Sequence, residues 1–387
     1  MAFVGHTGTS GAGSQLAAQK RTHRVAACDV RMSERADAGT PSAKGTASVL
    51  APGSRPIDQE KKLLLNPERG LEVLPVQVGV WSWGDRYWGY GGADFGEQQA
   101  QEAYNALLAH GLGWMDSAEV YGLGLSEKLL RKFDDARPRT LEKPMVATKF
   151  APLPWRLTGR SVPGALRASL SRLGRPKVEL YMQHWPGFLF NALSNDMYLD
   201  GLAQCYHQNL ADAIGVSNFQ VSRLRAAHAR LKADGVPLVS NQVHYSLAYR
   251  ACERNGVLET CRELGVQLFA YSPLAQGLLT GKYTEKNASK PGGARNLIFN
   301  QELLQQVQPT VDALRRIGEE RDKSPAQVAI NWLLCQGVTP IVGVKTAQQA
   351  DSLAGAVGWR LNDGEIDELD KMSRKITAMK GFPAENL

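Results

Sequence analysis

Four residues that can take part in acid–base chemistry follow three successive apolar segments of this sequence. Asp116 ends the first segment and Tyr121 follows it in a Gly-rich turn, Lys149 ends the second, and His184 ends the third. A lysine ammonium beside a tyrosine favours the phenolate and lowers the pKa of the phenol from its ordinary value near ~10. The set therefore predicts that Tyr121 donates a proton to a carbonyl oxygen. Lys149 and Asp116 are expected to adjust the pKa of Tyr121, and His184 is expected to orient the carbonyl.

Each residue taken alone has a simpler interpretation. Asp116 could cap a turn, Tyr121 could pack in the core, Lys149 could lie on the surface, and His184 could be a hydrogen-bonded histidine at the rim. Their occurrence at the ends of three consecutive strands favours the chemical interpretation. The sequence has no evident flavin motif or metal cluster, so we expect a nicotinamide hydride to supply the electrons.

The segments that carry these residues belong to a regular alternation of strands and helices. The predicted strands are 76–80, one ending at 116, 145–150, 178–184, 211–217, 238–243, 267–271 and 339–344. The predicted helices are 97–110, 126–133, 162–173, 196–208, 221–231, 257–264, 301–321, 325–335, 346–357 and 363–376. A small hairpin is expected over 62–74, around the turn signal Asn66-Pro67.

Eight short apolar strands, each followed by a helix, require a parallel sheet covered on both sides. We predict an α/β fold, a closed (β/α)8 TIM barrel with an N-terminal β-hairpin and extra C-terminal helices. The alternative is an open doubly wound sheet, but no G-x-G-x-x-G turn follows the first strand. The long loop 275–299 is expected to act as a lid or a cofactor clasp.

Charge is distributed unevenly along the 387 residues. The net charge is +7, of which +4 lies in residues 1–55, a segment rich in Ala, Ser, Thr and Gly. This segment is predicted to be a disordered organellar transit peptide, with a disordered tail as the alternative, and 56–387 to be the catalytic domain. Chloroplast is the expected location, with mitochondrion or cytoplasm as alternatives.

Composition also bears on partners. The rest of the chain has no long basic run with interleaved aromatic residues, which argues against nucleic-acid binding, and no run of 18 apolar residues, which argues against a membrane span. The five cysteines are scattered, without a C-x-x-C pair, as is typical of a reducing compartment. The expected partner is a small-molecule carbonyl substrate, and the oligomeric state is not predicted.

Several motifs in order resemble those of the aldo-keto reductases, especially the plant and algal chloroplast-type members. The resemblance covers roughly residues 60–380. The motifs are Trp81-Ser-Trp-Gly, Asp116-Ser-Ala-Glu-Val-Tyr-Gly, Ala147-Thr-Lys-Phe, Gln183-His-Trp-Pro-Gly, Gly215-Val-Ser-Asn-Phe, Asn241-Gln-Val-His-Tyr-Ser and Ala270-Tyr-Ser-Pro-Leu-Ala-Gln-Gly.

The resemblance implies an NADPH-dependent reductase of aldehydes and ketones, with the four catalytic residues in the roles given above. It implies that Ser217, Asn218 and Gln242 hold the nicotinamide carboxamide and that Tyr271 stacks on the ring. Ser272, Pro273, Leu274 and Lys282 would line the pyrophosphate path, and Arg295 would contact the adenosine end. Trp81, Trp83 and Trp88 could form an apolar substrate wall or pack at the barrel mouth, and Trp81 is counted among the cofactor contacts.

The segment Gly343-Val-Lys345-Thr-Ala-Gln-Gln349 matches the family segment that receives the adenosine 2′-phosphate. A helix N-terminus offers free N–H groups to an anion, and Lys345 adds positive charge. The sequence departs from the family at Val342, where proline is usual, and at Ser352 and Leu353, where an acidic residue and asparagine are usual.

Two other functions fit parts of the pattern. A Schiff-base lyase would use Lys149 as an amine nucleophile, but Asp116 would keep that amine protonated. A redox-sensing module would bind NADPH with little turnover, but the four intact catalytic positions argue against a purely regulatory role.

Overall fold

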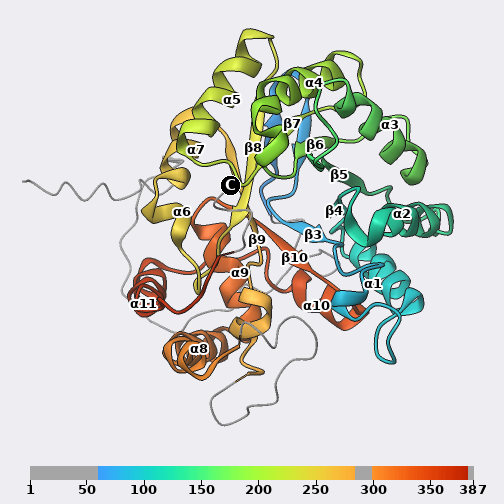
Figure 1. Ribbon diagram of the computed structural model, residues 1–387. Helices are drawn as coiled ribbons and strands as arrows, with labels where there is room; N and C mark the ends of the chain where they lie inside the picture. The colour runs from blue at the N-terminus through green and yellow to red at the C-terminus, as the bar shows by residue number, and fades with distance from the viewer. Residues whose placement is uncertain (1–59, 284–298, 382–387) are drawn as a thin grey trace, which may run out of the picture. The chain divides into compact units, whose positions relative to one another are not determined.

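The protein forms a closed eight-stranded parallel barrel, as predicted. The computed structural model describes residues 60–283 and 299–381, so the predicted transit peptide and Arg295 lie outside the described residues. Around the barrel the strands follow the order β10-β3-β4-β5-β6-β7-β8-β9 (Figure 1). They are β3 (Gln77–Gly79), β4 (Trp114–Asp116), β5 (Met145–Phe150), β6 (Leu180–Gln183), β7 (Ile214–Ser217), β8 (Leu238–His244), β9 (Gln267–Tyr271) and β10 (Thr339–Gly343).

Helices surround the barrel, and most follow a strand directly (Figure 1). They are α1 (Glu97–Ala109), α2 (Leu125–Asp135), α3 (Ser161–Leu173), α4 (Asn195–His207), α5 (Val221–Ala233), α6 (Ala251–Arg254), α7 (Val257–Leu264), α8 (Gln301–Arg321), α9 (Pro325–Cys335), α10 (Ala347–Ala354) and α11 (Asp363–Ser373). One apolar stripe of α1 is buried and consists of Ala100, Ala103, Tyr104, Leu107 and Leu108. None of the described helices is long and apolar enough to cross a membrane.

Strand register explains why the chemistry gathers at one end of the barrel. Asp116 pairs with Ala147 on the neighbouring strand, and Lys149 lies two residues further along β5. Because side chains alternate between the two faces of a strand, Ala147 and Lys149 point to the same side. Both Asp116 and Lys149 are buried at the carboxyl ends of their strands.

The predicted hairpin packs at the opposite end of the barrel. Strand β1 (Leu63–Asn66) pairs antiparallel with β2 (Leu71–Val73), with the short 3₁₀ helix η2 (Pro67–Arg69) between them. Its Leu65 and Val73 belong to the same apolar cluster as Trp114 and Phe269. The hairpin therefore covers the amino-terminal end of the barrel and leaves the carboxyl end for the site.

The extra C-terminal helices are tied to the barrel by Arg250, which is almost fully buried just before α6. Its guanidinium donates to Asp370 at 2.9 Å and to Ser373 at 2.7 Å on α11, and it also pairs with Glu253. A buried arginine needs such partners, because an unpaired buried charge is strongly destabilising. The pairing fixes α11 against the segment that follows β8.

The structure differs from the sequence prediction mainly at strand ends and tight turns. The predicted strands 178–184 and 211–217 begin later, since their first residues form only an isolated bridge between Val178 and Ala211. Four 3₁₀ helices among the described residues were not predicted: η3 (Arg86–Trp88), η4 (Tyr121–Gly124), η5 (Leu189–Ser194) and η6 (Ala275–Thr280). Two of them contain non-glycine residues with positive φ, Leu123 and Gln276, which residue type alone does not indicate.

Candidate active site

Tyr121 is held in place by the tight turn of η4. Gly122 has φ 55°, and a Cβ at this position would lie 2.5 Å from the carbonyl oxygen of Gly84. Glycine therefore allows η4 to approach the β3–α1 loop closely. On the same side, the ring of Trp81 stacks on the ring of Tyr121, with centroids 5.6 Å apart.

Lys149 is the centre of a compact hydrogen-bond network. Its Nζ donates to Oδ2 of Asp116 at 2.6 Å, to the backbone oxygen of Ser117 at 2.8 Å and to Oη of Tyr121 at 3.2 Å. An ammonium has three N–H donors, and the three bonds use all of them. The Lys149 side chain is 0% exposed and the Asp116 side chain is 4% exposed, so the ion pair is almost completely removed from water.

Burial and charge act on these groups in opposite directions. Burial alone would lower the pKa of Lys149, but Asp116 and Tyr121 raise it above its ordinary value. Burial raises the pKa of Tyr121, while the nearby Lys149 ammonium lowers it, and the net shift is upward. The predicted downward shift of the Tyr121 pKa is therefore wrong for this buried site, and Tyr121 stays protonated at neutral pH.

His184 completes the predicted group of four. Its backbone N–H donates to the oxygen of Phe150 at 2.8 Å, which places the residue beside the end of β5. Its ring lies edge-on to Tyr121, with centroids 5.6 Å apart. Burial and the Lys149 charge hold the pKa of His184 well below its ordinary value, so the imidazole is neutral at pH 7. The buried Nδ1 has no hydrogen-bond partner among the described residues.

Gln242 makes a contact that was not predicted. Its Nε2 donates to Oδ1 of Asp116 at 3.1 Å, across the barrel from β8 to β4. The two oxygens of Asp116 thus have separate donors, Gln242 and Lys149. Gln242 therefore contacts the network around Lys149 and also lies among the residues expected to hold the nicotinamide beside β7 and β8.

The other residues predicted for the nicotinamide also lie together. Ser217 Oγ donates to the backbone oxygen of Gln242 at 2.8 Å. The side-chain amide of Asn218 donates to Ser217 Oγ and to the backbone oxygen of His184, both at 3.2 Å. Tyr271 donates from its hydroxyl to Oδ1 of Asn218 at 3.0 Å. Its ring stacks on His244, a neighbour that was not predicted.

The segment after β9 has an unusual backbone. Ser272, Ala275 and Gln276 all have positive φ, at 53°, 47° and 57°. For residues with a side chain this conformation costs about 1–3 kcal/mol each and is concentrated at ligand sites. The buried Oε1 of Gln276 has no hydrogen-bond partner among the described residues. The predicted Pro273 is buried, Leu274 is partly buried, and Lys282 is exposed.

Comparison with known proteins agrees with this arrangement. Residues 75–374 match the model of the aldo/keto reductase family. The chain belongs to the aldo/keto reductase family. It is therefore an oxidoreductase, as predicted.

Three similar proteins illustrate the match. A chloroplastic pyridoxal reductase of Arabidopsis thaliana is 38% identical over 313 residues, covering 79% of this chain and 84% of the relative. An aldo-keto reductase of Schizosaccharomyces pombe, named for NADP(+), is 28% identical, covering 70% and 82%. The crystal structure of an aldo-keto reductase from Klebsiella pneumoniae in complex with NADPH has a TM-score of 0.60 at 21% identity, covering 81% and 96%.

In this aldo/keto reductase, the residues predicted for the 2′-phosphate lie at the end of β10 but contact one another. The backbone N–H of Lys345 donates to Oε1 of Gln349 at 2.8 Å. Its ammonium donates to the backbone oxygen of Trp88 and lies 5.0 Å from the ring centroid of Phe95. Gly343 is exposed, with no atom within 4 Å of where a Cβ would be. Lys345 thus links this segment to the β3–α1 loop.

The tryptophans of the β3–α1 loop divide between the two predicted roles. Trp83 is fully buried and donates to the backbone oxygen of Val344 at 2.7 Å, so it packs the barrel mouth. Trp81 is exposed, stacks on Tyr121 and meets Trp88 edge-on at 5.0 Å. Only Trp81 is therefore placed to form a wall of the site against Tyr121.

Glu119 is a site-supporting residue that the sequence interpretation missed, although it lies inside the Asp116–Tyr121 motif. Its Oε1 accepts from the backbone N–H of Ala151 at 2.7 Å, and its Oε2 accepts from Arg156 at 2.9 Å. The pair fixes the turn that carries Tyr121 against the loop after β5. The presence of a glutamate in this motif could have suggested a structural role. Its partner Arg156 lies 37 residues further along the chain, and sequence spacing does not predict that contact.

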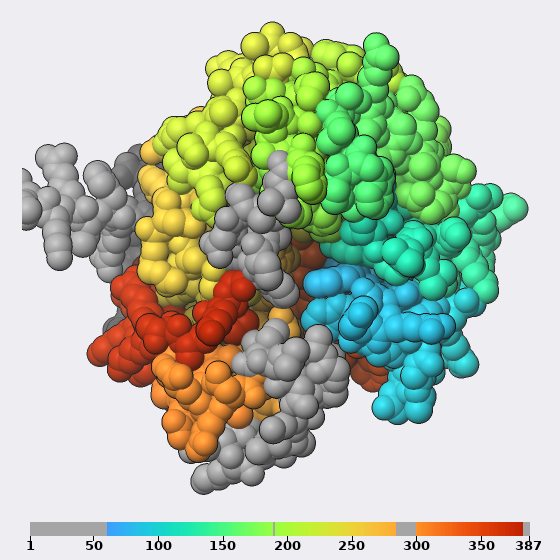
Figure 2. Space-filling view, viewed as in Figure 1, coloured from blue at the N-terminus to red at the C-terminus, as the bar shows by residue number. Residues whose placement is uncertain are grey.

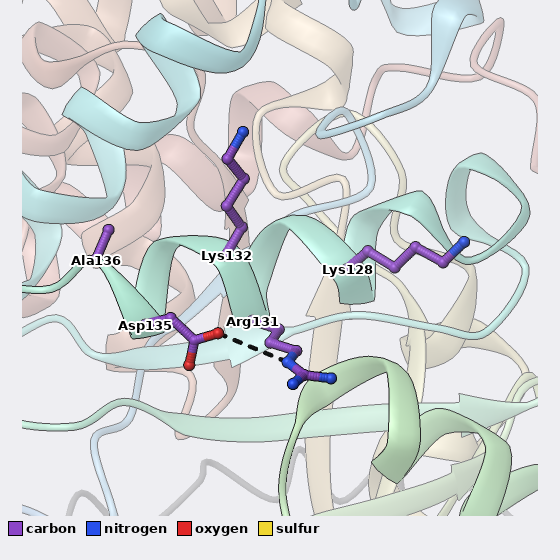
Figure 3. Close-up of a pocket in the computed structure, with 5 residues that line it drawn as sticks. All are labelled: Lys128, Arg131, Lys132, Asp135 and Ala136. Carbon is purple, nitrogen blue, oxygen red and sulfur yellow. Dashed lines mark ion pairs between the residues drawn. The ribbon is translucent and has the colours of Figure 1, made fainter.

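The charged residues on the surface of α2 are exposed to water, in contrast to the buried Lys149–Asp116 pair. A hollow on the outer side of α2 is lined by Lys128, Arg131, Lys132, Asp135 and Ala136 (Figure 3). Arg131 and Asp135 form an exposed ion pair at 3.6 Å. Exposed pairs of this kind contribute about 0–1 kcal/mol. The described residues contain no group of three or more acidic, histidine or cysteine side chains that could hold a metal.

The burial of the Lys149–Asp116 pair leads to a prediction about stability. Lys149→Met leaves the Asp116 carboxylate without its ammonium, and we expect the free energy of unfolding to fall by about 3–5 kcal/mol. Adding Asp116→Asn should recover part of that loss. Urea unfolding of the two single variants and the double variant measures the coupling.

The exposed pair Arg131–Asp135 provides the matched control. Arg131→Met, Asp135→Asn and their double variant should each shift the free energy of unfolding by less than about 1 kcal/mol. Equal losses at the buried and exposed pairs would contradict the buried ion pair as described.

Proposed function

We propose that this aldo/keto reductase uses NADPH to reduce aldehydes and ketones to alcohols, with Tyr121 as the proton donor. The observation that carries the proposal is the use of all three Lys149 N–H groups. Because Lys149 donates to Tyr121 Oη, the tyrosine oxygen accepts there and its own O–H remains for another acceptor. A carbonyl oxygen at the barrel mouth is that acceptor.

The residues at the ends of β7 to β10 are suited to NADPH. The positive φ of Ser272, Ala275 and Gln276 supports a ligand site there, as does the Gln276 oxygen, which has no partner among the described residues. The residues that would hold the cofactor are Ser217, Asn218, Gln242 and Tyr271 at the nicotinamide, Ser272, Pro273, Leu274 and Lys282 along the pyrophosphate, and Gly343, Lys345 and Gln349 at the adenosine phosphate. Arg295 remains a sequence-based prediction for the adenosine end.

The chemistry divides between cofactor and protein. When bound, the nicotinamide supplies a hydride to the carbonyl carbon. Tyr121 gives its proton to the carbonyl oxygen, and the adjacent Lys149 ammonium stabilises the phenolate that remains. Neutral His184 offers an uncharged polar contact that orients the carbonyl without competing as an acid. Asp116 and Gln242 keep the lysine charged and in position.

The alternatives receive less support. A Schiff-base lyase requires a neutral, accessible amine, whereas Lys149 is fully buried, triply hydrogen-bonded and has a raised pKa. A purely redox-sensing module would not need the contact between Lys149 and Tyr121. The contact between Lys149 and Tyr121 therefore supports an enzyme with Tyr121 as the proton donor.

Aromatic rings surround the proton donor and bear on the substrate. Trp81 stacks on Tyr121, and His184 in turn meets Trp185 with centroids 4.6 Å apart. Such walls suit a carbonyl attached to a flat or apolar group. The name of the Arabidopsis thaliana relative makes pyridoxal, an aromatic aldehyde, one candidate substrate to test.

Tyr121→Phe tests the proton donor. We expect kcat for NADPH-dependent reduction of benzaldehyde or pyridoxal to fall at least ~100-fold, since general acid catalysis contributes about that much or more. NADPH binding, followed by its fluorescence, should not change. A variant with wild-type turnover would exclude Tyr121 as the acid.

The direction of the pKa shifts predicts the pH profile. A raised Tyr121 pKa keeps the donor protonated until the pH exceeds about 10, and a lowered His184 pKa places the titration of His184 well below its ordinary value of about 6.5. Activity should therefore stay level from about pH 6.5 to about pH 10 and fall above that. A step near pH 6.5 would instead indicate an ordinary histidine at the site.

Lys345→Ala tests the phosphate end. Loss of one charged hydrogen bond to the 2′-phosphate should weaken NADPH binding about 10-fold, at roughly 1.4 kcal/mol, and leave NADH binding nearly unchanged. Isothermal titration with both cofactors measures the ratio, and Lys128→Ala on the outer side of α2 serves as the control. Equal losses of affinity for NADPH and NADH would contradict a role of Lys345 in binding the 2′-phosphate.

A plastid is the proposed location. The composition of residues 1–55 supports it, and the Arabidopsis thaliana relative is named as chloroplastic. A fluorescent protein fused after residue 55 should enter chloroplasts of plant cells. Uptake into mitochondria alone, or retention outside both organelles, would contradict the proposal.

A further inference from the structure

Lys345, which the proposed function assigns to the adenosine phosphate, also contacts the loop that follows β3. Strands β10 and β3 are neighbours in the barrel, so the segments that leave their carboxyl ends start side by side. The Lys345 ammonium donates to the backbone oxygen of Trp88 and lies 5.0 Å from the ring centroid of Phe95. In Figure 2 the blue segment that follows β3 lies at the surface. A charged group proposed for the cofactor is therefore bonded to a surface loop of the site.

Trp88 ends the short helix η3, and its ring contacts the wall of the site. It meets the ring of Trp81 edge-on, with centroids 5.0 Å apart, and Trp81 in turn stacks on Tyr121. Aromatic rings in such arrangements attract one another beyond the effect of burial alone. The position of Trp88 therefore affects how the Trp81 ring lies against the proton donor.

Asp85 forms a second link between Trp81 and η3. Its Oδ2 accepts from Nε1 of Trp81 at 2.9 Å, and its Oδ1 accepts from the backbone N–H of Tyr87 at 2.8 Å. Its backbone oxygen accepts from the N–H of Trp88 at 3.1 Å. Asp85 thus caps η3 and holds the Trp81 indole with the same side chain, so a displacement of η3 would also displace the indole.

The position of η3 depends on contacts from outside the loop, because the backbone after it is permissive. Gly89 and Gly91 have φ 88° and 80°, a region that favours glycine, and glycine loses more conformational freedom on ordering than any other residue. Lys345 donates to the carbonyl at the carboxyl end of η3. The last carbonyls of a helix lack partners within it, and a cation there is favourable. Lys345 is therefore well placed to fix η3.

We propose that Lys345 and Trp88 are positioning residues for the carbonyl substrate: Lys345 holds η3, and η3 holds Trp81 against Tyr121. We refer to this series of contacts, from Lys345 through η3 to Trp81, as the loop path. The inference rests on the proposed function and gives Lys345 a role that is separate from its charge toward the 2′-phosphate. One side chain thereby serves both recognition of the cofactor and binding of the carbonyl substrate.

Lys345→Ala at saturating NADPH separates the two roles. Coupling between two sites changes an affinity by about 5-fold or more, so we expect KM for benzaldehyde to rise about 5-fold. The kcat should stay unchanged, because the bonds of Lys149 to Asp116 and Tyr121 are intact. The same rise in KM is expected with saturating NADH, which has no 2′-phosphate. A loss confined to NADPH affinity, with KM for benzaldehyde unchanged, would overturn the proposal.

Trp88→Ala interrupts the loop path at its second step. The backbone oxygen that accepts from Lys345 remains, so NADPH affinity should stay at the wild-type value, while KM for benzaldehyde should rise as in Lys345→Ala. Because both substitutions act on one path, the double variant should raise KM no further than either single variant. Additive effects would show separate roles and reject the loop path. Tyr87→Ala is the matched control, since Tyr87 also lies in η3, is 83% exposed and should leave KM unchanged.

A measurement that needs no turnover follows Trp81 directly. Its indole N–H gives a signal in a nitrogen–hydrogen correlation NMR spectrum, which Trp81→Phe assigns. The signal should move in Lys345→Ala, a substitution that removes no aromatic ring. The indole of Trp332, which donates to Asp370 at 3.1 Å, is the internal reference and should not move. An unmoved Trp81 signal in Lys345→Ala would contradict the loop path.

The two measurements distinguish failure of the loop path from failure of the proposed function. Absence of NADPH-dependent reduction by the wild-type enzyme would reject the proposed function, and the Trp81 signal would still test the contact with Lys345. Reduction by the wild type, combined with an unchanged KM and an unmoved signal in Lys345→Ala, would reject the loop path and leave the proposed function in place.

Discussion

The buried ion pair between Lys149 and Asp116 is the interaction on which the site depends. Removing an ammonium from water costs several kcal/mol unless its partners are well placed, and here Asp116, the Ser117 carbonyl and Tyr121 satisfy all three donors. The pair needs two adjacent strands ending side by side, which the register of β4 and β5 provides. The Tyr121 oxygen accepts from the lysine, which leaves the O–H of Tyr121 to donate to another acceptor.

Contacts from several other elements of the barrel hold this pair in position. Gln242 reaches Asp116 across the interior, and Glu119 fastens the turn before Tyr121 to the loop after β5. Gly122 allows that turn to approach Gly84 closely. At the opposite end the hairpin and Trp114 fill the interior. The polar residues at the mouth therefore stand on a packed apolar base, which fixes their positions without contributing to the chemistry.

The sequence predicted the parts of this architecture that depend on local pattern. Alternating strands and helices indicated the barrel, and residues at strand ends indicated Asp116, Tyr121, Lys149 and His184. Contacts between side chains from distant elements, such as Gln242 with Asp116 and Lys345 with Trp88, depend on directions that spacing does not contain. The sign of the Tyr121 pKa shift was wrong because burial outweighs the lysine charge, and burial is a property of the fold.

The two halves of the barrel mouth, after β3 to β6 and after β7 to β10, carry different side chains. After β9, positive φ at Ser272, Ala275 and Gln276 costs free energy, and such backbone is concentrated at ligand sites. Exposed apolar side chains such as Phe190 and Leu193 after β6 add little to stability, because water surrounds them in the folded and the unfolded chain alike. Both halves of the mouth meet at the Lys149–Asp116 network, since Tyr121 follows β4 and Gln242 reaches Asp116 from β8.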